Sequence, residues 1–522
     1  MGLSGGQIAI FWFLGFGFLF WSCHCRQTFG FDLHHKFSEP VKEWMSLRHG
    51  IGYEEWPESG SEDYYLSLVH HDHNLRGRGI SEIGAPLTFA DGNTTFKLSS
   101  LGFLHYSFVT LGTPNVTFLV ALDTGSDLFW VPCDCSRCAP TLSMSYGFDF
   151  ELNIYNSNAS STSKHVSCSN SLCQWQSECS RSTGHCPYQV SYVSDDTSSS
   201  GVLIEDVLYL TTDDSQVVKA PITFGCGQVQ SGSFLDAAAP NGLFGLGVEK
   251  LSVPSILSGL GLIHDSFSMC FGQDGIGRIR FGDNGSSDQE ETPFNLDQSY
   301  PTYNISITDI QVGSSSIKTG FSALFDSGTS FTYLADPIYT RLAKSFDIQV
   351  PDKRHQPDSR LPFEYCYNAS SNVNSNIPDV SLLMQGGSRF PIYDPIISFS
   401  TQGHIVYCLA VVKGEGMNII GQNFMTGLRI VFDREKLVLG WKKFNCYDVE
   451  NTSTLDIKPP YTVPPSSSVA PDNYAPEDTK TMGNTTQVSI PPPPPLSDAA
   501  RLFVFGFTRA LSPLFLLFVA LF

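Results

Sequence analysis

The sequence predicts an all-β protein made of two related lobes. Between Lys97 and Cys446, short runs of Val, Ile, Thr and Phe alternate with Gly, Pro, Asn and Asp, as strands separated by turns do. Helical patterns are short in this stretch. A motif around Asp123 returns 203 residues later around Asp326, which indicates two halves of similar structure.

The individual elements follow these patterns in chain order. Six strand-like stretches are the clearest: residues 108–111, 117–122, 207–210, 222–225, 278–281 and 430–432. Residues 336–346 have the periodicity of a short helix. We expect the first lobe at 96–295, with a cysteine-rich insert, and the second lobe at 296–447.

Composition narrows the functional classes. The formal net charge is −20, which makes nucleic acid or an anionic lipid surface a poor partner. Only 16% of the 522 residues are charged while 13% are aromatic, so the chain is not an acidic disordered protein and has a large apolar core. Fourteen cysteines favour a secreted protein over a cytosolic one.

Each copy of the repeat places an acidic residue where an apolar strand ends. Asp123 begins an Asp-Thr-Gly motif and Asp326 an Asp-Ser-Gly motif, and each copy has a later apolar–apolar–Gly step, ending at Gly245 and Gly421. The glycine after each Asp lets backbone N–H groups point at the carboxylate. One such motif would fit a simple Asp-capped turn. Two copies facing across a pseudo-twofold axis would share one proton, so that one carboxylate deprotonates a water while the other polarises a peptide carbonyl.

These paired motifs resemble those of pepsin-like aspartic proteases, specifically the nepenthesin-type plant branch, over residues 104–446. The resemblance implies a bilobal fold with an active-site cleft between the lobes, catalytic residues Asp123 and Asp326, and no metal or cofactor. It also implies a set of residues that orient the two carboxylates: Thr124, Gly125, Ser126, Ser327, Gly328 and Thr329. The residue directly after each Asp is expected to link the two turns. The hydroxyl residue three positions after each Asp is expected to bond its outer oxygen.

The same resemblance implies a hairpin flap over the substrate. Tyr192 is the expected flap residue, with Tyr188 as the alternative, and Trp130 is placed to bond the flap hydroxyl or else to lie in the core. The sequence departs from the family here, because Tyr192 is followed by Val-Ser-Asp-Asp instead of Gly-Asp-Gly-Ser. The stretch after Asp326 is too short for the saposin-like insert of other plant aspartic proteases, which supports the nepenthesin-type branch.

The cysteines predict a disulfide framework. Twelve remain once Cys23 and Cys25 leave with a signal peptide, and seven of them crowd into residues 133–186, so at least one bridge must leave this cluster. Family resemblance suggests Cys366–Cys408, and a Cys226–Cys446 bridge would tie the lobes together. The alternative for Cys133, Cys135 and Cys138 is a zinc site.

Both ends of the chain carry targeting patterns. Residues 1–25 predict a signal peptide, with a membrane anchor as the alternative, and 26–95 a prosegment. Residues 448–498 form a Pro/Ser/Thr-rich stalk, and 499–522 resemble a GPI-attachment propeptide, with Asp498 or Ser497 as the attachment residue and Asn484 as an outside choice. The alternative is a single membrane span over 502–522, which Arg509 disfavours.

Eight glycosylation sequons fit this route: Asn93, Asn115, Asn158, Asn284, Asn304, Asn368, Asn451 and Asn484. The prosegment holds six histidines, and we expect their protonation below about pH 6.5 to weaken its docking on the acidic body and trigger cleavage near Arg76–Arg78. His70, His71 and His73 could alternatively bind a metal or lie on the surface without a function.

The sequence therefore predicts a monomeric aspartic endopeptidase of the secretory pathway, active at acidic pH on polypeptides and held by a GPI lipid at the outer face of the cell membrane. The main alternative is a catalytically silent glycoprotein of the same fold that binds a protein or ligand in its cleft. A structural glycoprotein of the cell wall is a more remote alternative.

Overall fold

The computed structural model describes residues 28–49, 56–76, 105–139, 153–179, 184–192, 197–212, 216–235, 239, 241–272, 276–295, 302–356, 361–370, 377–401, 404–444 and 446. All of them belong to one unit of the chain, Met1–Leu455. The predicted signal peptide, stalk and GPI propeptide lie outside the described residues. So do Asn93, Asn451, Asn484, Ser497 and Asp498.

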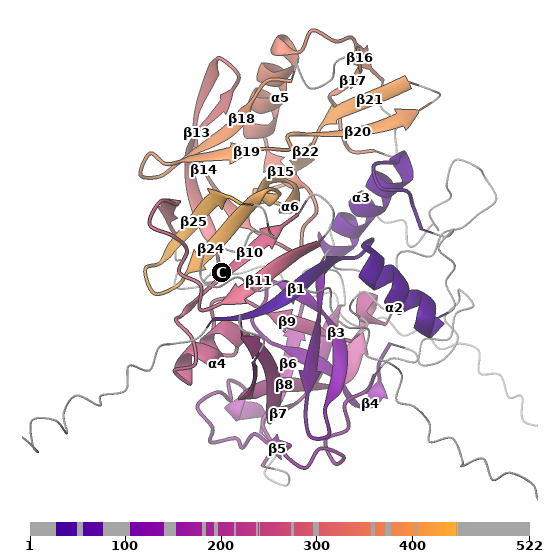
Figure 1. Ribbon diagram of the computed structural model, residues 1–522, viewed down its shortest axis with the longest axis vertical. Coiled ribbons are helices and arrows are strands. Elements are labelled where there is room, and N and C mark those ends of the chain that lie inside the picture. The colour runs from indigo at the N-terminus through magenta and orange to yellow at the C-terminus, as the bar shows by residue number, and fades with distance from the viewer. Residues whose placement is uncertain are drawn as a thin grey trace, which may run out of the picture. The chain divides into compact units, whose positions relative to one another are not determined.

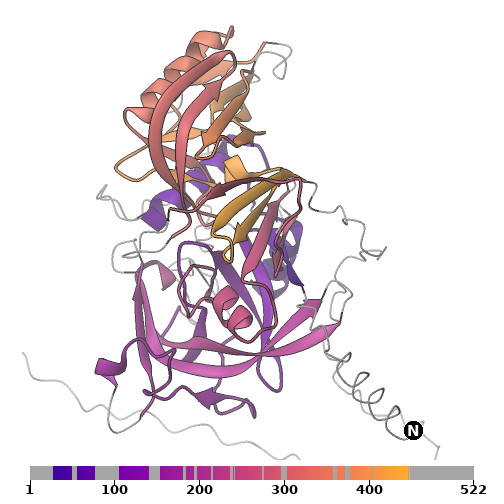
Figure 2. The ribbon, with the colours of Figure 1, turned by 90° about the vertical axis from the view of Figure 1, so that its left-hand side faces the viewer.

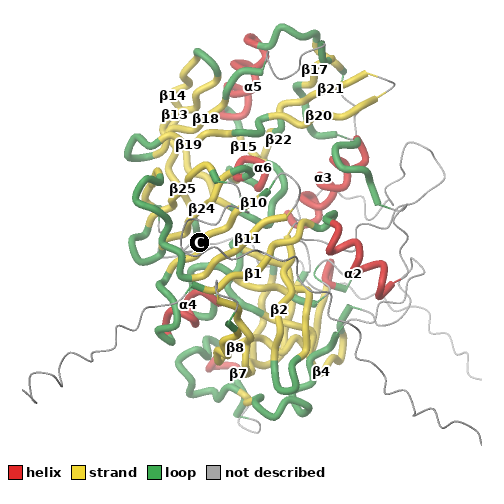
Figure 3. Tube along the Cα trace, in the orientation of Figure 1, coloured by secondary structure: helices red, strands yellow, loops and turns green. Residues whose placement is uncertain are grey.

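Strands dominate the described residues, and the structure confirms an all-β, two-lobed fold (Figures 1 and 3). The largest sheet has 14 strands, in the order β12-β25-β24-β10-β11-β1-β2-β3-β9-β4-β8-β7-β5, with β6 paired to β7. Its strands are β1 (Phe29–His35), β2 (His105–Leu111), β3 (Val116–Asp123), β4 (Trp130–Arg137), β5 (Lys164–His165), β6 (Pro187–Ser191), β7 (Ser198–Thr212), β8 (Val217–Ser231), β9 (Leu243–Gly245), β10 (Ser266–Phe271), β11 (Ile276–Phe281), β12 (Glu290–Pro293), β24 (Leu428–Asp433) and β25 (Val438–Lys443).

The second half of the chain builds two smaller sheets, of seven strands (β19-β18-β13-β14-β23-β15-β22) and four strands (β16-β17-β21-β20). Their strands are β13 (Asn304–Val312), β14 (Ser315–Phe325), β15 (Thr332–Ala335), β16 (Arg354–His355), β17 (Cys366–Asn368), β18 (Val380–Met384), β19 (Arg389–Ile392), β20 (Ile396–Thr401), β21 (His404–Leu409), β22 (Val411–Gly414) and β23 (Ile419–Ile420). Figure 2 shows these strands, in salmon and orange, at one end and the purple and magenta strands of the first half at the other.

In the described residues, helices are few and short. They are α2 (Glu39–His49), α3 (Glu62–Arg76), α4 (Val253–Gly259), α5 (Ile338–Gln349), α6 (Gln422–Met425) and the 3-10 turns η3 (Gln176–Glu178) and η4 (Gly232–Phe234). All six strand stretches expected from the sequence lie within strands of the structure. The expected helix at 336–346 begins later, at Ile338, because Pro337 occupies its N-cap, and it continues to Gln349.

The N-terminal segment is part of the sheet. β1 pairs antiparallel with β11 on one side and with β2 on the other, in a register that sets Phe29 opposite Phe281 and His35 opposite His105. Phe29 and Leu33 are fully buried, so the segment contributes to the core. His34 and His35 are also buried, and burial lowers the pKa of His34 although the charge of Asp32 raises it. These two histidines are therefore not surface residues.

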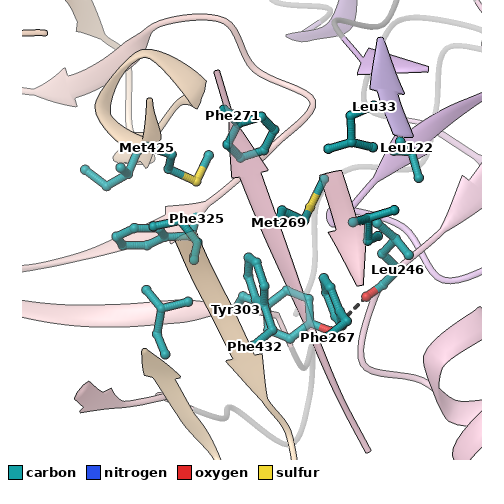
Figure 4. Close-up of a cluster of buried hydrophobic side chains, with 14 of the residues drawn as sticks. Leu33, Leu122, Leu246, Phe267, Met269, Phe271, Tyr303, Phe325, Met425 and Phe432 are labelled. Carbon is teal, nitrogen blue, oxygen red and sulfur yellow. Dashed lines mark hydrogen bonds between the residues drawn. The ribbon is translucent and has the colours of Figure 1, made fainter. Parts of the chain in front are cut away.

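One continuous core joins the two halves (Figure 4). It brings Leu33 of β1, Phe267 of β10 and Phe325 of β14 into the same buried cluster. The ring of Phe267 stacks on Phe432 with centroids 4.7 Å apart, and the hydroxyl of Tyr303 donates to the carbonyl of Leu246 at 2.7 Å. Each fully buried side chain of this size stabilises the fold by roughly 1.5–3 kcal/mol.

Six disulfides join all twelve cysteines from Cys133 onward: Cys133–Cys226, Cys135–Cys138, Cys168–Cys179, Cys173–Cys186, Cys270–Cys446 and Cys366–Cys408. The structure thus pairs Cys366 with Cys408, as expected. The suggested Cys226–Cys446 bridge is wrong. Cys226 lies on β8 beside β4, which carries Cys133, whereas Cys446 follows β25 and reaches Cys270 on β10.

The zinc alternative is also wrong for the cysteine-rich insert. Cys135 and Cys138 are bonded to each other, so neither offers a thiolate. Within the described part of the chain, one group has the spacing of a metal site, namely Cys133, Asp134 and Cys226. Its two sulfur atoms form a disulfide, and this group has no free thiolate to bind a metal either.

Candidate active site

Two strand ends carry the predicted dyad. β3 ends at Asp123 and β14 ends one residue before Asp326. Each strand pairs in parallel with a two- or three-residue strand from the later apolar–apolar–Gly step, β9 in the first half and β23 in the second. The backbone of Asp123 accepts from Leu246 N at 2.9 Å, and Asp326 N donates to the carbonyl of Ile420 at 3.1 Å. The repeated steps of the sequence therefore anchor the two acidic turns.

Gly245 and Gly421 make this close packing possible. A side chain on Gly245 would lie 2.2 Å from the carbonyl oxygen of Asp127, and one on Gly421 would lie 2.2 Å from that of Phe331. Both are main-chain carbonyl oxygens, which cannot move aside as the end of a flexible side chain can. Any other residue at either position would push the neighbouring acidic loop out of place.

Both carboxylates accept the same set of hydrogen bonds. The inner oxygens, Oδ1 of Asp123 and of Asp326, accept from the backbone N–H two residues later, Gly125 or Gly328, at 2.9 Å in each case. The outer oxygens accept from hydroxyls three residues later. Ser126 donates to Asp123 Oδ2 at 2.5 Å, and Thr329 donates to Asp326 Oδ2 at 2.6 Å. The two aspartates are therefore held in matching orientations.

The two turns also meet each other. A side chain on Gly125 would lie 3.2 Å from Oδ1 of Asp123 and 3.9 Å from Oδ1 of Asp326, so both inner oxygens border one small space. Behind them, the hydroxyls of Thr124 and Ser327 are 3.4 Å apart, and Ser327 N donates to Thr124 Oγ1 at 3.1 Å. Gly125 is exposed and Asp326 is half-buried, so this space is open to solvent.

The two carboxylates differ in burial, and burial changes the pKa of Asp123. Burial, together with the charge of Asp326, raises the pKa of Asp123 to about 7, although the hydrogen bonds from Ser126 and Gly125 act in the other direction. Asp123 therefore holds a proton below neutral pH. Its partner, Asp326, is the more exposed of the two.

Of the two flap candidates, Tyr192 is the one beside the dyad. Its hydroxyl accepts from Trp130 Nε1 at 2.9 Å, and burial and the nearby charge of Asp123 raise its pKa. Tyr188 is buried instead against Gly225 and shares a 2.8 Å hydrogen bond with the hydroxyl of Ser199. The turn that departs from the family pattern, residues 193–196, lies outside the described residues.

One residue at the site was not predicted from the sequence. Asp72 of α3 is fully buried, and its carboxylate accepts from the backbone N–H groups of Ser330 and Phe331, directly after the Asp326 turn. Helical spacing could have identified it, because Leu66, Val69 and Asp72 recur every three residues and share one buried face. An acid on such a face needs a partner.

The predicted sequons that the structure describes differ in exposure. Asn115, Asn158 and Asn368 are exposed. Asn284 and Asn304 are half-buried, and their side-chain oxygens accept from Ser266 at 2.5 Å and from Asn295 at 3.2 Å. The exposed three are therefore the better sites for a glycan, and glycosylation stays a prediction for all five.

Comparisons with known proteins agree with this geometry. A family model described as "Xylanase inhibitor N-terminal" matches residues 105–283, and one described as "Xylanase inhibitor C-terminal" matches residues 302–443. "Aspartyl protease family protein 1" of Arabidopsis thaliana is 51% identical over 451 residues, which cover 84% of this chain and 87% of that protein. "Aspartic proteinase-like protein 1" of the same plant is 40% identical, with 84% of each chain covered.

Solved structures share the fold. Conglutin gamma, a basic 7S globulin from lupine seeds, matches with a TM-score of 0.52 at 20% identity and covers 66% of this chain and 92% of its own. Basic 7S globulin from soybean matches with the same TM-score at 21% identity, covering 67% and 92%. The mirrored Asp turns, the two matched halves and the extent of identity lead to one conclusion: the chain belongs to the aspartyl protease family, in its pepsin-like, xylanase-inhibitor-related type.

Proposed function

We propose that this chain is an aspartic endopeptidase of the nepenthesin type, which hydrolyses peptide bonds with a water activated between Asp123 and Asp326. The mirrored hydrogen bonds carry the proposal. Each carboxylate accepts a glycine N–H on the inner oxygen and a hydroxyl on the outer one, and both inner oxygens border the same open space. A carboxylate that served only to cap a turn would have no need of a matching partner.

In the proposed reaction, the half-buried Asp326 takes a proton from the water as its oxygen attacks the peptide carbonyl carbon. Protonated Asp123 hydrogen-bonds the carbonyl oxygen and gives up its proton as the tetrahedral species forms. The C–N bond then breaks, the amine leaves with the proton held by Asp326, and Asp123 regains one from the hydroxyl of the collapsing species. Because Asp123 is protonated below about pH 7, we expect the protein to be active at acidic pH.

Digestion of a denatured protein tests this proposal. The full-length protein should cleave casein between pH 3 and 6, pepstatin should block the cleavage, and Asp326→Asn should lower it by about 10³-fold. Ser67→Ala is a suitable control, because Ser67 lies on α3 and donates to its own helix at the carbonyl of Asp63. Intact casein with the unmodified protein throughout this pH range would refute the peptidase.

The alternative is a member that binds a protein in the same place without hydrolysis. The match to the models described as xylanase inhibitor supports this alternative, and conglutin gamma, a basic 7S globulin, shares the fold. Both Asp turns and their hydroxyl partners are complete here, and this supports the peptidase over the binding protein.

We also propose that the protein is secreted and held at the outer cell surface by a GPI lipid on Asp498 or Ser497. The sequence patterns at 1–25 and 499–522 support this proposal. None of the helices in the described residues is long and apolar enough to cross a bilayer. A phosphatidylinositol-specific phospholipase should release the protein from intact cells. If the protein stays on cells from which a known GPI protein is released, the anchor is refuted.

A further inference from the structure

The carboxylate of Asp72 occupies a preformed set of donors. Asp72 Oδ1 accepts from Ser330 N at 2.8 Å, and Oδ2 accepts from Phe331 N at 3.1 Å and from the hydroxyl of Tyr333 at 3.1 Å. Successive backbone N–H groups that converge on one point form an anion-binding concavity, and hydrogen bonds to a carboxylate are among the strongest in proteins. The arrangement is therefore a carboxylate site with an internal occupant.

The donors keep their places without help from Asp72. The loop that carries them is bonded within the second lobe: Gln422 N donates to the carbonyl of Thr329, and Asn423 N to the carbonyl of Ser330. Gly421 N donates to the hydroxyl of Thr332 at 3.2 Å. Asp72, by contrast, comes from the N-terminal segment, 258 residues before Ser330. The site would thus remain, with the N–H groups of Ser330 and Phe331 still directed at it, if α3 moved away.

The site adjoins the dyad. Thr329, the residue before Ser330, donates to the outer oxygen of Asp326. The walls are apolar, since the buried ring of Phe331 packs edge-on against Phe363 with centroids 5.0 Å apart. The first donor, Ser330 N, is therefore only one residue along the chain from a group that binds the Asp326 carboxylate.

We propose that the N–H groups of Ser330 and Phe331 and the hydroxyl of Tyr333 form a subsite for an acidic side chain of a polypeptide substrate, which Asp72 fills until α3 leaves. This inference rests on the proposed peptidase function. Lys36 is buried with Asp72, but it belongs to the same departing segment, and burial lowers its pKa to about 7 against the charge of Asp72. The recognition therefore comes from the neutral donors of the second lobe, which favour a carboxylate over an amide.

The first test examines the site apart from any activity. In the full-length protein, Asp72→Ala should lower the thermal midpoint, and about 200 mM sodium acetate near pH 6.5 should raise it again by at least about 2 °C over equal sodium chloride. Acetamide should give no such rise, and Tyr333→Phe in the Asp72→Ala protein should reduce it. Asp72→Ser, whose smaller side chain also leaves room for acetate, serves if Asp72→Ala does not fold. Equal effects of acetate and chloride would overturn the carboxylate site.

The second test examines substrate choice. Full-length protein activated by acid receives peptide pairs that differ by Glu or Gln at one position, each position in turn. At pH 5.5 we expect kcat/KM to be about tenfold higher for the Glu peptide than for the Gln peptide at one position, through a lower KM. At pH 3.5, where Glu is protonated, this preference should be lost. Tyr333→Phe should reduce the preference without abolishing cleavage of the Gln peptide.

The two failures are distinguishable. Cleavage of both peptides at equal rates at every position would overturn the acidic subsite and leave the peptidase standing. Absence of cleavage of either peptide would overturn the peptidase and with it the substrate role of the site, whereas the acetate measurement would still decide whether a carboxylate binds there.

Discussion

Asp123→Asn should abolish hydrolysis and at the same time make the protein more stable at neutral pH. The loss of activity, about 10³-fold, follows from removing the acid that polarises the carbonyl. The gain in stability follows from the raised pKa of Asp123, because the fold favours its protonated form. In the unmodified protein that contribution is complete below about pH 4, the unfolded value, and is lost as the pH rises through about 7. Asparagine is neutral at every pH, so Asp123→Asn keeps this stabilising contribution at pH 7.

Urea unfolding at pH 4 and at pH 7 measures this difference. The two proteins should unfold alike at pH 4, and Asp123→Asn should be more stable by on the order of a few kcal/mol at pH 7. Asp206→Asn is the matched control of opposite sign. Burial disfavours the charge of Asp206, but hydrogen bonds from Ser160, Thr162 and Tyr155 hold its pKa below the usual value, so this variant should be less stable at pH 7. Destabilisation by Asp123→Asn at pH 7 would contradict the assignment of the proton to Asp123.

Arg429→Met should destabilise the protein by about 3–5 kcal/mol, because it leaves a buried carboxylate without its cation. Arg429 on β24 and Asp283 after β11 form an ion pair and are 4% and 8% exposed. Burial alone raises the pKa of Asp283, but the charge of Arg429 and the hydrogen bonds from Ser268 and Gly285 lower it further than burial raises it. The stabilisation is therefore present at neutral pH and is lost as acid protonates Asp283.

Urea unfolding also tests this pair. Asp283→Asn combined with Arg429→Met should recover part of the loss, because the amide leaves no buried charge. The exposed pair of Lys442 and Asp288, 3.0 Å apart, provides the matched control, and Lys442→Met should change stability little. An effect of Arg429→Met no larger than that of Lys442→Met would show that the buried pair is not needed to hold β24 to the turn after β11.

The local parts of the site were predictable from the sequence, and the long-range parts were not. An apolar run followed by Asp-Thr-Gly or Asp-Ser-Gly specifies its own turn, so the loops at Asp123 and Asp326 form as expected. Their meeting could be inferred because the repeat implies symmetry. The disulfide partner of Cys226 could not be inferred. The pairing with Cys133 depends on β8 lying parallel to β4, a strand that is remote from β8 in the sequence.

The N-terminal segment shows the same limit. Its histidines suggested a prosegment whose docking weakens on protonation, but residues 29–35 form strand β1 inside the sheet, where His34 and His35 are buried together with Phe29 and Leu33. Asp72 was missed because its partners, Ser330 and Phe331, are defined only once α3 packs on the second lobe. A buried charge is specified by tertiary packing, whereas a turn is specified by its own residues.

The position of β1 has a consequence for maturation. β1 is hydrogen-bonded to β11 and β2, and each of the six disulfides joins residues between 133 and 446. A single proteolytic nick between α3 and β2 would therefore leave β1 attached to the rest of the protein by non-covalent contacts, whether or not α3 has left its site. The processed protein would migrate as one species on a native gel and as two polypeptides in detergent, with or without reductant.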